Sequence, residues 1–125
     1  MAFRYSTQLR DAGLDARVKA VGPSPVLKIY SEGQKGGEVS GELVSINLPL
    51  AWMKKASDGI IESDEPWHGI ATGKGMAKSF RIYDKAEKTC HIEGAIPDDM
   101  ALDNRNIAPD QLVTVTVFVI KSGNG

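Results

Sequence analysis

Residues 112–121 read Leu-Val-Thr-Val-Thr-Val-Phe-Val-Ile-Lys and carry the clearest secondary-structure signal in the chain. Valine occupies every second position from Val113 to Val119, and threonine stands between the first three valines. Strict alternation of β-branched side chains is typical of a β-strand with two different faces. Residues 117–120 are apolar on both faces, so we expect either a central strand or a strand that a partner covers.

The same short, alternating segments recur from residue 25 onward, separated by Gly, Pro, Asp and Asn. The further strands are expected at 26–31, 38–48, 60–62, 67–72, 76–84 and 88–96. Gly73 and Gly75 predict a hairpin loop between two of them, 67–72 and 76–84. A polar crossing at 98–110 is expected to be anchored by its few large apolar side chains, which are Met100, Leu102 and Ile107. This spacing predicts a mainly β fold, an antiparallel β-sandwich or jelly roll, with closure into a barrel as the alternative.

One segment, residues 6–21, has the spacing of an α-helix. Ser6 or Thr7 can cap its first amides, and Leu9, Ala12, Ala16 and Ala20 align one face, with Leu14, Val18 and Val21 beside them. Gly22 followed by Pro23 is a stop signal. We therefore expect one short N-terminal helix ahead of the strands. Because no second amphipathic helix separates any two strands, the sequence disfavours a parallel α/β fold.

Length and charge favour a single domain over residues 1–125. The chain has 15 Lys+Arg against 16 Asp+Glu, a net charge of -1, which lacks the basic excess of a nucleic-acid-binding protein.

The only cysteine, Cys90, has no partner for an internal disulfide. No apolar run approaches the ~20 residues of a membrane span or forms a signal peptide. We expect a protein that is made in a cytoplasm and that binds neither nucleic acid nor membrane.

Residues that commonly carry chemistry are few and scattered, so we predict no enzyme, no metal site and no cofactor. Cys90 and His91 are neighbours in a predicted strand and point to opposite faces, which prevents both from reaching one ion. His68 is the only other histidine. An enzyme would require one of these histidines to meet a carboxylate in a pocket. The acidic residues at 98–99 and 103 lack the spacing of a calcium loop.

The segment 50–67 interrupts the strand pattern, and we predict it as the principal partner-contact region. It carries both tryptophans, a methionine and a basic pair, which are types enriched at interfaces. The predicted contact residues are Phe3, Tyr5, Trp52, Met53, Lys54, Lys55, Trp67 and Phe118. Two alternatives remain open: the tryptophans close the ends of the sandwich, or they form a sugar-binding platform with Tyr83.

Several short segments together resemble a family of small virion structural proteins of tailed bacteriophages, often encoded among the head genes. They are Leu-Asp-Ala-Arg-Val at 14–18, Pro-Val-Leu-Lys-Ile-Tyr-Ser at 25–31, Ala-Lys-Ser-Phe-Arg-Ile-Tyr-Asp at 77–84, His-Ile-Glu-Gly at 91–94, Leu-Asp-Asn at 102–104 with Ile107, and 111–118. The resemblance covers most of the chain in outline, and the segment 50–65 departs from it.

This resemblance implies a capsid decoration or cement protein, a β-sandwich that oligomerises and clamps neighbouring subunits of the major capsid protein. We therefore expect a non-enzymatic protein on the capsid surface of the virion, with the major capsid protein as its partner. A homo-oligomer is expected, a dimer first and a trimer second. The alternative is a carbohydrate-binding or structural β-sandwich module of a phage tail or tail fibre.

Overall fold

The computed structural model describes residues 6–33 and 39–121 and shows a mainly β, antiparallel fold with one helix, as the sequence predicts. Its largest element is a four-stranded sheet with the order β2-β1-β6-β7. The strands are β1 (Val26–Gly33), β2 (Val39–Asn47), β6 (Ser79–Tyr83) and β7 (Cys90–Ala95). All three pairings are antiparallel, and β1 and β6 lie in the middle.

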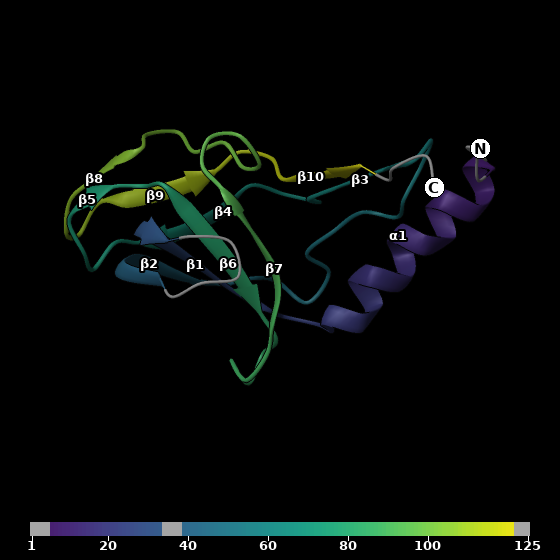
Figure 1. The fold of residues 1–125 in the computed structure, drawn as a ribbon, viewed down its shortest axis with the longest axis horizontal. Coiled ribbons are helices and arrows are strands. Elements are labelled where there is room, and N and C mark those ends of the chain that lie inside the picture. Colours follow the sequence, from purple (N-terminus) through teal and green to yellow (C-terminus); the bar gives the residue numbers. More distant parts are fainter. Residues whose placement is uncertain (1–5, 34–38, 122–125) are drawn as a thin grey trace.

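Two-stranded ribbons form a second layer over one face of this sheet (Figure 1). They pair β4 (Trp67–Ile70) with β9 (Leu112–Val115), β5 (Gly75–Met76) with β8 (Asn106–Ile107), and β3 (Ile60–Glu62) with β10 (Val119–Lys121). The layers meet closely at Gly69, where a Cβ atom would lie 2.5 Å from the side chain of Ile46. Glycine at this position therefore allows β4 to pack directly on β2.

The hydrophobic core lies between the two layers. In the sheet it includes Leu27, Ile29, Val44, Ile46, Phe80 and Ile82, which alternate with polar residues of the opposite face. The second layer contributes Trp67, Val113 and Val115. Met100 and Ile107 are buried and Leu102 packs against the core, which confirms the predicted anchors of the 98–110 crossing.

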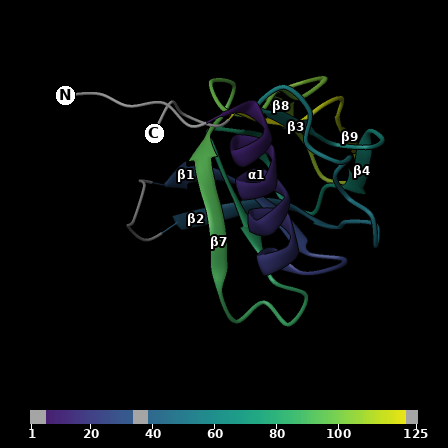
Figure 2. The same ribbon diagram turned by 90° about the vertical axis from the view of Figure 1, so that its right-hand side faces the viewer.

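Helix α1 (Thr7–Val21) stands across one end of the two layers (Figures 1 and 2). Ser6 is its N-cap, with Oγ accepting a hydrogen bond from the Leu9 amide, and Gly22 ends it with φ 91°. Two carboxylates fasten the helix to the turn before β3. Asp15 accepts from the Ala56 amide at 2.9 Å, and Asp11 accepts from the Gly59 amide at 2.6 Å. No helix in the described ranges has the length and apolar character needed to cross a membrane.

The predicted apolar face of the helix was wrong. Leu14 and Val21 are buried and Val18 packs on the core, whereas Leu9 is 55% exposed. The face that turns inward carries Leu14, Val18 and Val21, together with the two aspartates that bond to the turn before β3.

The predicted hairpin between 67–72 and 76–84 was also wrong, because β4 pairs with β9 and β5 pairs with β8. The single strand predicted at 112–121 is in fact two, β9 and β10. Between them, residues 116–118 face residues 63–66, so three residues oppose four and the register shifts. Pro66, which has no N–H for the ladder, lies in that opposing segment. Among the described strands β9 pairs only with β4, and on its other edge it has the isolated bridge between Val115 and Leu102 in place of a second strand.

Candidate functional site

Three of the predicted contact residues are core aromatic residues. Trp52, Trp67 and Phe118 are 1%, 2% and 3% exposed. Their rings form a row with Phe80: centroids are 6.1 Å apart for the two tryptophans, 5.7 Å for Trp67 and Phe118, and 5.6 Å for Phe118 and Phe80. Side chains buried this deeply have almost no surface to offer a partner. We therefore correct the contact assignment of these residues and assign them to the core.

The other predicted contact residues divide between core and surface. Met53 bridges to Ser63 at the edge of β3 and is also buried, so its contact assignment is corrected in the same way. Lys54 and Lys55 are exposed, and the Lys54 ammonium lies 3.3 Å from the carboxylate of Glu62. Their predicted role in partner contact stays a prediction. Phe3 and Tyr5 lie outside the described residues.

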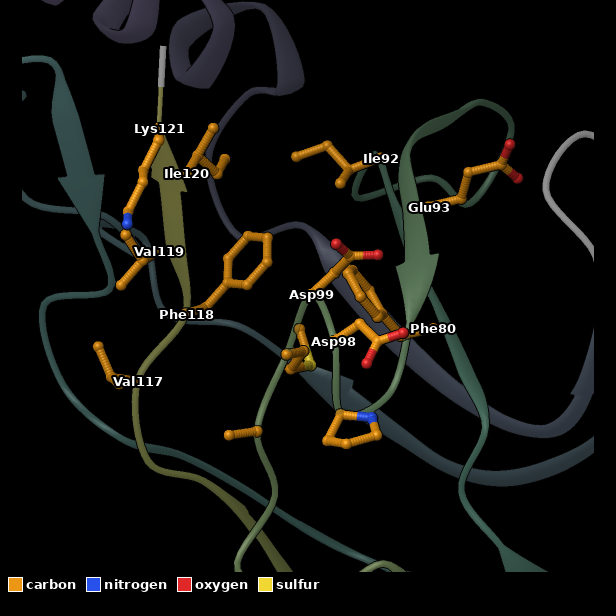
Figure 3. Close-up of a pocket in the computed structure, with 13 residues that line it drawn as sticks. Phe80, Ile92, Glu93, Asp98, Asp99, Val117, Phe118, Val119, Ile120 and Lys121 are labelled. Carbon is orange, nitrogen blue, oxygen red and sulfur yellow. The ribbon is translucent and has the colours of Figure 1, made fainter. Parts of the chain in front are cut away.

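An open groove of about 580 Å³ runs between β10 and the segment that follows β7 (Figure 3). We call it the β10 groove. Its lining comprises Phe80, Ile92, Glu93, residues 97–101 and residues 117–121. Phe118 and Ile120 extend from β10 towards the middle of the groove, and Asp98 and Asp99 lie across from them, on the segment that follows β7 (Figure 3). The sequence signal for this site is the apolar run at 117–120, which predicts a central strand or a strand that a partner covers but does not indicate a groove.

The backbone edge of β10 faces this groove. On the far side of β3, the Glu62 carbonyl accepts from the Lys54 amide, and Ile60 exchanges two hydrogen bonds with Ser57. In an antiparallel ladder, a residue whose N–H and C=O groups point away from the partner strand forms no hydrogen bond with the residue opposite it. The N–H and C=O groups of that opposite residue then also point away, towards the other edge of the ribbon. Those partners on β10 are Val119 and Lys121. Their N–H and C=O groups therefore point away from β3, and β10 pairs with no other described strand.

The floor of the β10 groove is apolar and its rim is mostly acidic. Phe80, Met100 and Phe118 are buried beneath it. Asp98 and Asp99 are exposed on one side, with Glu93 half-buried beside them, and Lys121 is the one basic residue of the lining.

Two of the acidic groups also have structural contacts. The Asp99 carboxylate accepts from the Ala95 amide at 2.8 Å, and the Glu93 carboxylate lies 3.4 Å from the Arg81 guanidinium group. A Cβ atom on Gly94 would lie 2.9 Å from the Asp99 carboxylate and 2.7 Å from the Phe80 ring. Glycine at this position lets the acidic turn approach the floor.

A second polar cluster covers the outer face of the four-stranded sheet. The Lys28 ammonium lies 2.7 Å from Glu87 and 3.2 Å from Glu42, and these contacts raise the pKa of Lys28. The hydroxyl groups of Tyr30 and Tyr83 are 3.2 Å apart. Burial raises the pKa of Tyr30, and this hydrogen bond adds to the shift. The cluster is internally paired, which favours a structural role.

The scattered reactive residues stay apart in the fold. A bulge in β7 pairs Cys90 with Tyr83 on the outer face, where burial raises the pKa of its thiol and so lowers its reactivity. His68 Nδ1 lies 3.0 Å from the Thr114 hydroxyl oxygen, and His91 is exposed on β7. Within the described ranges, no group of three His, Cys, Asp or Glu side chains is placed to hold a metal ion.

The β10 groove is thus the site where an open cavity, an available backbone edge and a distinct charge coincide. Comparisons of the chain with protein families, with curated proteins and with solved structures find no match.

Proposed function

We propose that the chain is a non-enzymatic structural protein that binds the capsid of a tailed bacteriophage as a decoration or cement protein. The observation that supports binding to protein is the β10 groove, where an apolar floor lies beside an available strand edge. Such an edge presents regularly spaced donors and acceptors that another polypeptide matches. In this proposal the partner is the major capsid protein, and the protein resides on the outer surface of the virion. The phage assignment rests on the resemblance of the sequence segments.

The burial of the tryptophans favours this function over the alternative, a carbohydrate-binding module of a tail or tail fibre. Sugar-binding faces use exposed aromatic rings, because the rings stack on the apolar faces of pyranoses. Trp52 and Trp67 are buried against each other, and Tyr83 is half-buried with its hydroxyl group beside that of Tyr30. The alternative in which these three residues form a sugar-binding platform therefore has no support on the surface that the structure describes.

Self-association is part of the proposal, with a dimer first and a trimer second. Ile70 and Leu112 lie directly opposite each other in the β4–β9 ribbon and are 55% and 54% exposed. A cross-strand pair of large apolar side chains in water is typical of a contact patch. We expect light scattering at high micromolar concentration to give a dimer or trimer mass that Ile70→Lys reduces. A monomer at that concentration contradicts self-association in the absence of a capsid.

Co-sedimentation tests the function directly. Capsids assembled from the major capsid protein of the same phage, and lacking this chain, are mixed with the purified protein and separated on a density gradient. A cement protein reaches saturation at copy numbers comparable with those of the major capsid protein, and it raises the temperature at which the shell opens. Binding to tails in trace amounts favours the tail module instead, and the absence of binding to either contradicts both functions.

A further inference from the structure

We infer that the β10 groove binds an extended polypeptide segment by strand addition, and that this segment carries a basic side chain between apolar ones. This inference rests on the proposed function, because it specifies the kind of protein segment that the groove accepts. Strand addition here means that the incoming segment pairs with β10 and makes the β3–β10 ribbon three-stranded.

The backbone of β10 supplies the first part of the argument. Five consecutive residues, 117–121, line the groove. Because successive side chains of a strand point to opposite faces, a cavity lined by five neighbours reaches the edge of the strand as well as the face that carries Phe118 and Ile120. The N–H and C=O groups of Val119 and Lys121 point to this side, as the pairing of β3 requires. A segment of about five residues, at ~3.3 Å per residue, would cover the edge.

Side chains determine which segment fits. Phe118 and Ile120 extend towards the floor, so apolar side chains of the incoming segment find apolar contacts there. Asp98 and Asp99 are exposed on the opposite side, and Glu93 lies next to them. Because the Glu93 carboxylate is paired with Arg81, the ammonium group of Lys121 stands against two carboxylates of the lining, those of Asp98 and Asp99. The local charge is therefore negative although the whole chain carries only -1, and it favours a cationic side chain in the segment.

A five-residue probe tests the inference: fluorescein-labelled Thr-Val-Lys-Val-Thr with an amidated C-terminus, titrated into the full chain and followed by fluorescence anisotropy. The same peptide with Glu in place of Lys is expected to bind at least about tenfold more weakly, since a like charge then faces the acidic rim. Two analogues N-methylated at alternate positions test the backbone. Strand addition uses the N–H groups of only one alternate set, so one analogue should lose binding and the other should keep it. Equal binding of both analogues, or of the Lys and Glu peptides, overturns the inference.

Protein variants locate the binding site. Val119→Pro removes the N–H that faces the groove, and Val119→Ala removes the same side chain but keeps that N–H. We expect Val119→Pro to lose about tenfold or more in peptide affinity and Val119→Ala to lose no more than about threefold. Asp98→Lys should weaken binding, whereas Asp64→Lys, the same change of charge outside the lining, should not. If circular dichroism shows that Val119→Pro is unfolded, the N-methylated peptide analogues still test whether the segment binds by strand addition.

The outcomes separate this inference from the proposed function. A chain that binds the probe as described but fails to bind capsids contradicts the capsid function and leaves the groove assignment intact. In a second outcome, the wild type and the Val119→Pro and Asp98→Lys variants all saturate capsids equally well, and the chain does not bind the probe peptide. This outcome contradicts the groove assignment alone. A self-association that Val119→Pro abolishes identifies a second copy of the chain as the occupant and overturns the peptide assignment.

Discussion

Replacing Trp67 with alanine tests whether the row of aromatic rings belongs to the core or to a partner surface. Trp67 is 2% exposed and its ring lies between those of Trp52 and Phe118, at 6.1 and 5.7 Å. Truncation of a buried tryptophan to alanine costs about 3–5 kcal/mol, because apolar contacts are lost and a cavity remains. Each aromatic pair contributes ~0.5–1.5 kcal/mol beyond burial. Two such contacts place Trp67→Ala at the upper end, near 5 kcal/mol.

The matched control is Ile70→Ala, three residues along the same strand, where the side chain is 55% exposed. We expect this variant to lose less than about 1 kcal/mol. Urea unfolding followed by far-ultraviolet circular dichroism measures both changes without relying on tryptophan fluorescence. For a chain of this length, a loss of 5 kcal/mol corresponds to a decrease in melting temperature of about 15–20 °C. A loss below about 1 kcal/mol for Trp67→Ala, combined with weakened capsid binding, would refute the assignment to the core and restore the contact assignment.

Three further changes have expected outcomes. Gly94→Ala places a Cβ atom 2.7 Å from the Phe80 ring, so thermal unfolding should show a loss of about 1–3 kcal/mol, and an unchanged melting temperature would mean that the ring has room to move. Asp103→Ala removes the carboxylate that accepts from the Thr114 amide at the outer edge of β9, and urea unfolding should show a loss of about 1–2 kcal/mol, whereas Asp103→Asn should recover part of it. Burial raises the pKa of Tyr30 above its ordinary value near 10, so the phenol contributes stability that is present below pH 10 and is lost as the pH rises beyond it. Between pH 10 and 12, the free energy of unfolding of Tyr30→Phe should therefore fall less steeply with pH than that of the wild type. Equal slopes for the two proteins would contradict a raised pKa for Tyr30.

Local features of this fold could be predicted from the sequence because each depends on a few neighbouring residues. The Ser6 cap and the Gly22 stop follow from the conformations that those residues favour. The turn at Asp58 and Gly59 likewise reflects residues that tolerate positive φ, here 54° and 75°. Alternation within the strand expected at 26–31 puts Leu27 and Ile29 on one face, and both are buried in β1.

Strand partners could not be predicted in the same way. Gly73 and Gly75 suggested a local hairpin, but the chain instead pairs β4 with β9, more than forty residues away in the sequence. Such pairings depend on how the two layers pack around a shared core, so a local sequence pattern does not predict them. The bulge in β7 turns Cys90 to the outer face for a similar reason, since it depends on the register with β6.

The sequence indicated some residues of the candidate site but not the groove that they form. Tryptophan, methionine and lysine in the segment 50–67 are typical of interfaces, but composition does not distinguish a contact patch from a core plug, and Trp52 proved to be buried. The apolar run at 117–120 is apolar on both faces, which is unusual for a strand at an edge. Its meaning depended on the position of β10 at the edge of a two-stranded ribbon, beside the turn that holds Asp98 and Asp99.

Hydrogen–deuterium exchange of the chain, free and bound to capsids, tests the central claim most directly. The amides of Val119 and Lys121 face the β10 groove and have no acceptor among the described residues, so they should exchange rapidly in the free protein. If the groove receives a segment of the capsid protein, peptides covering residues 117–121 become protected in the complex, together with those covering Asp98 and Asp99. Protection confined to other surfaces, with residues 117–121 exchanging as fast as in the free protein, would contradict the account.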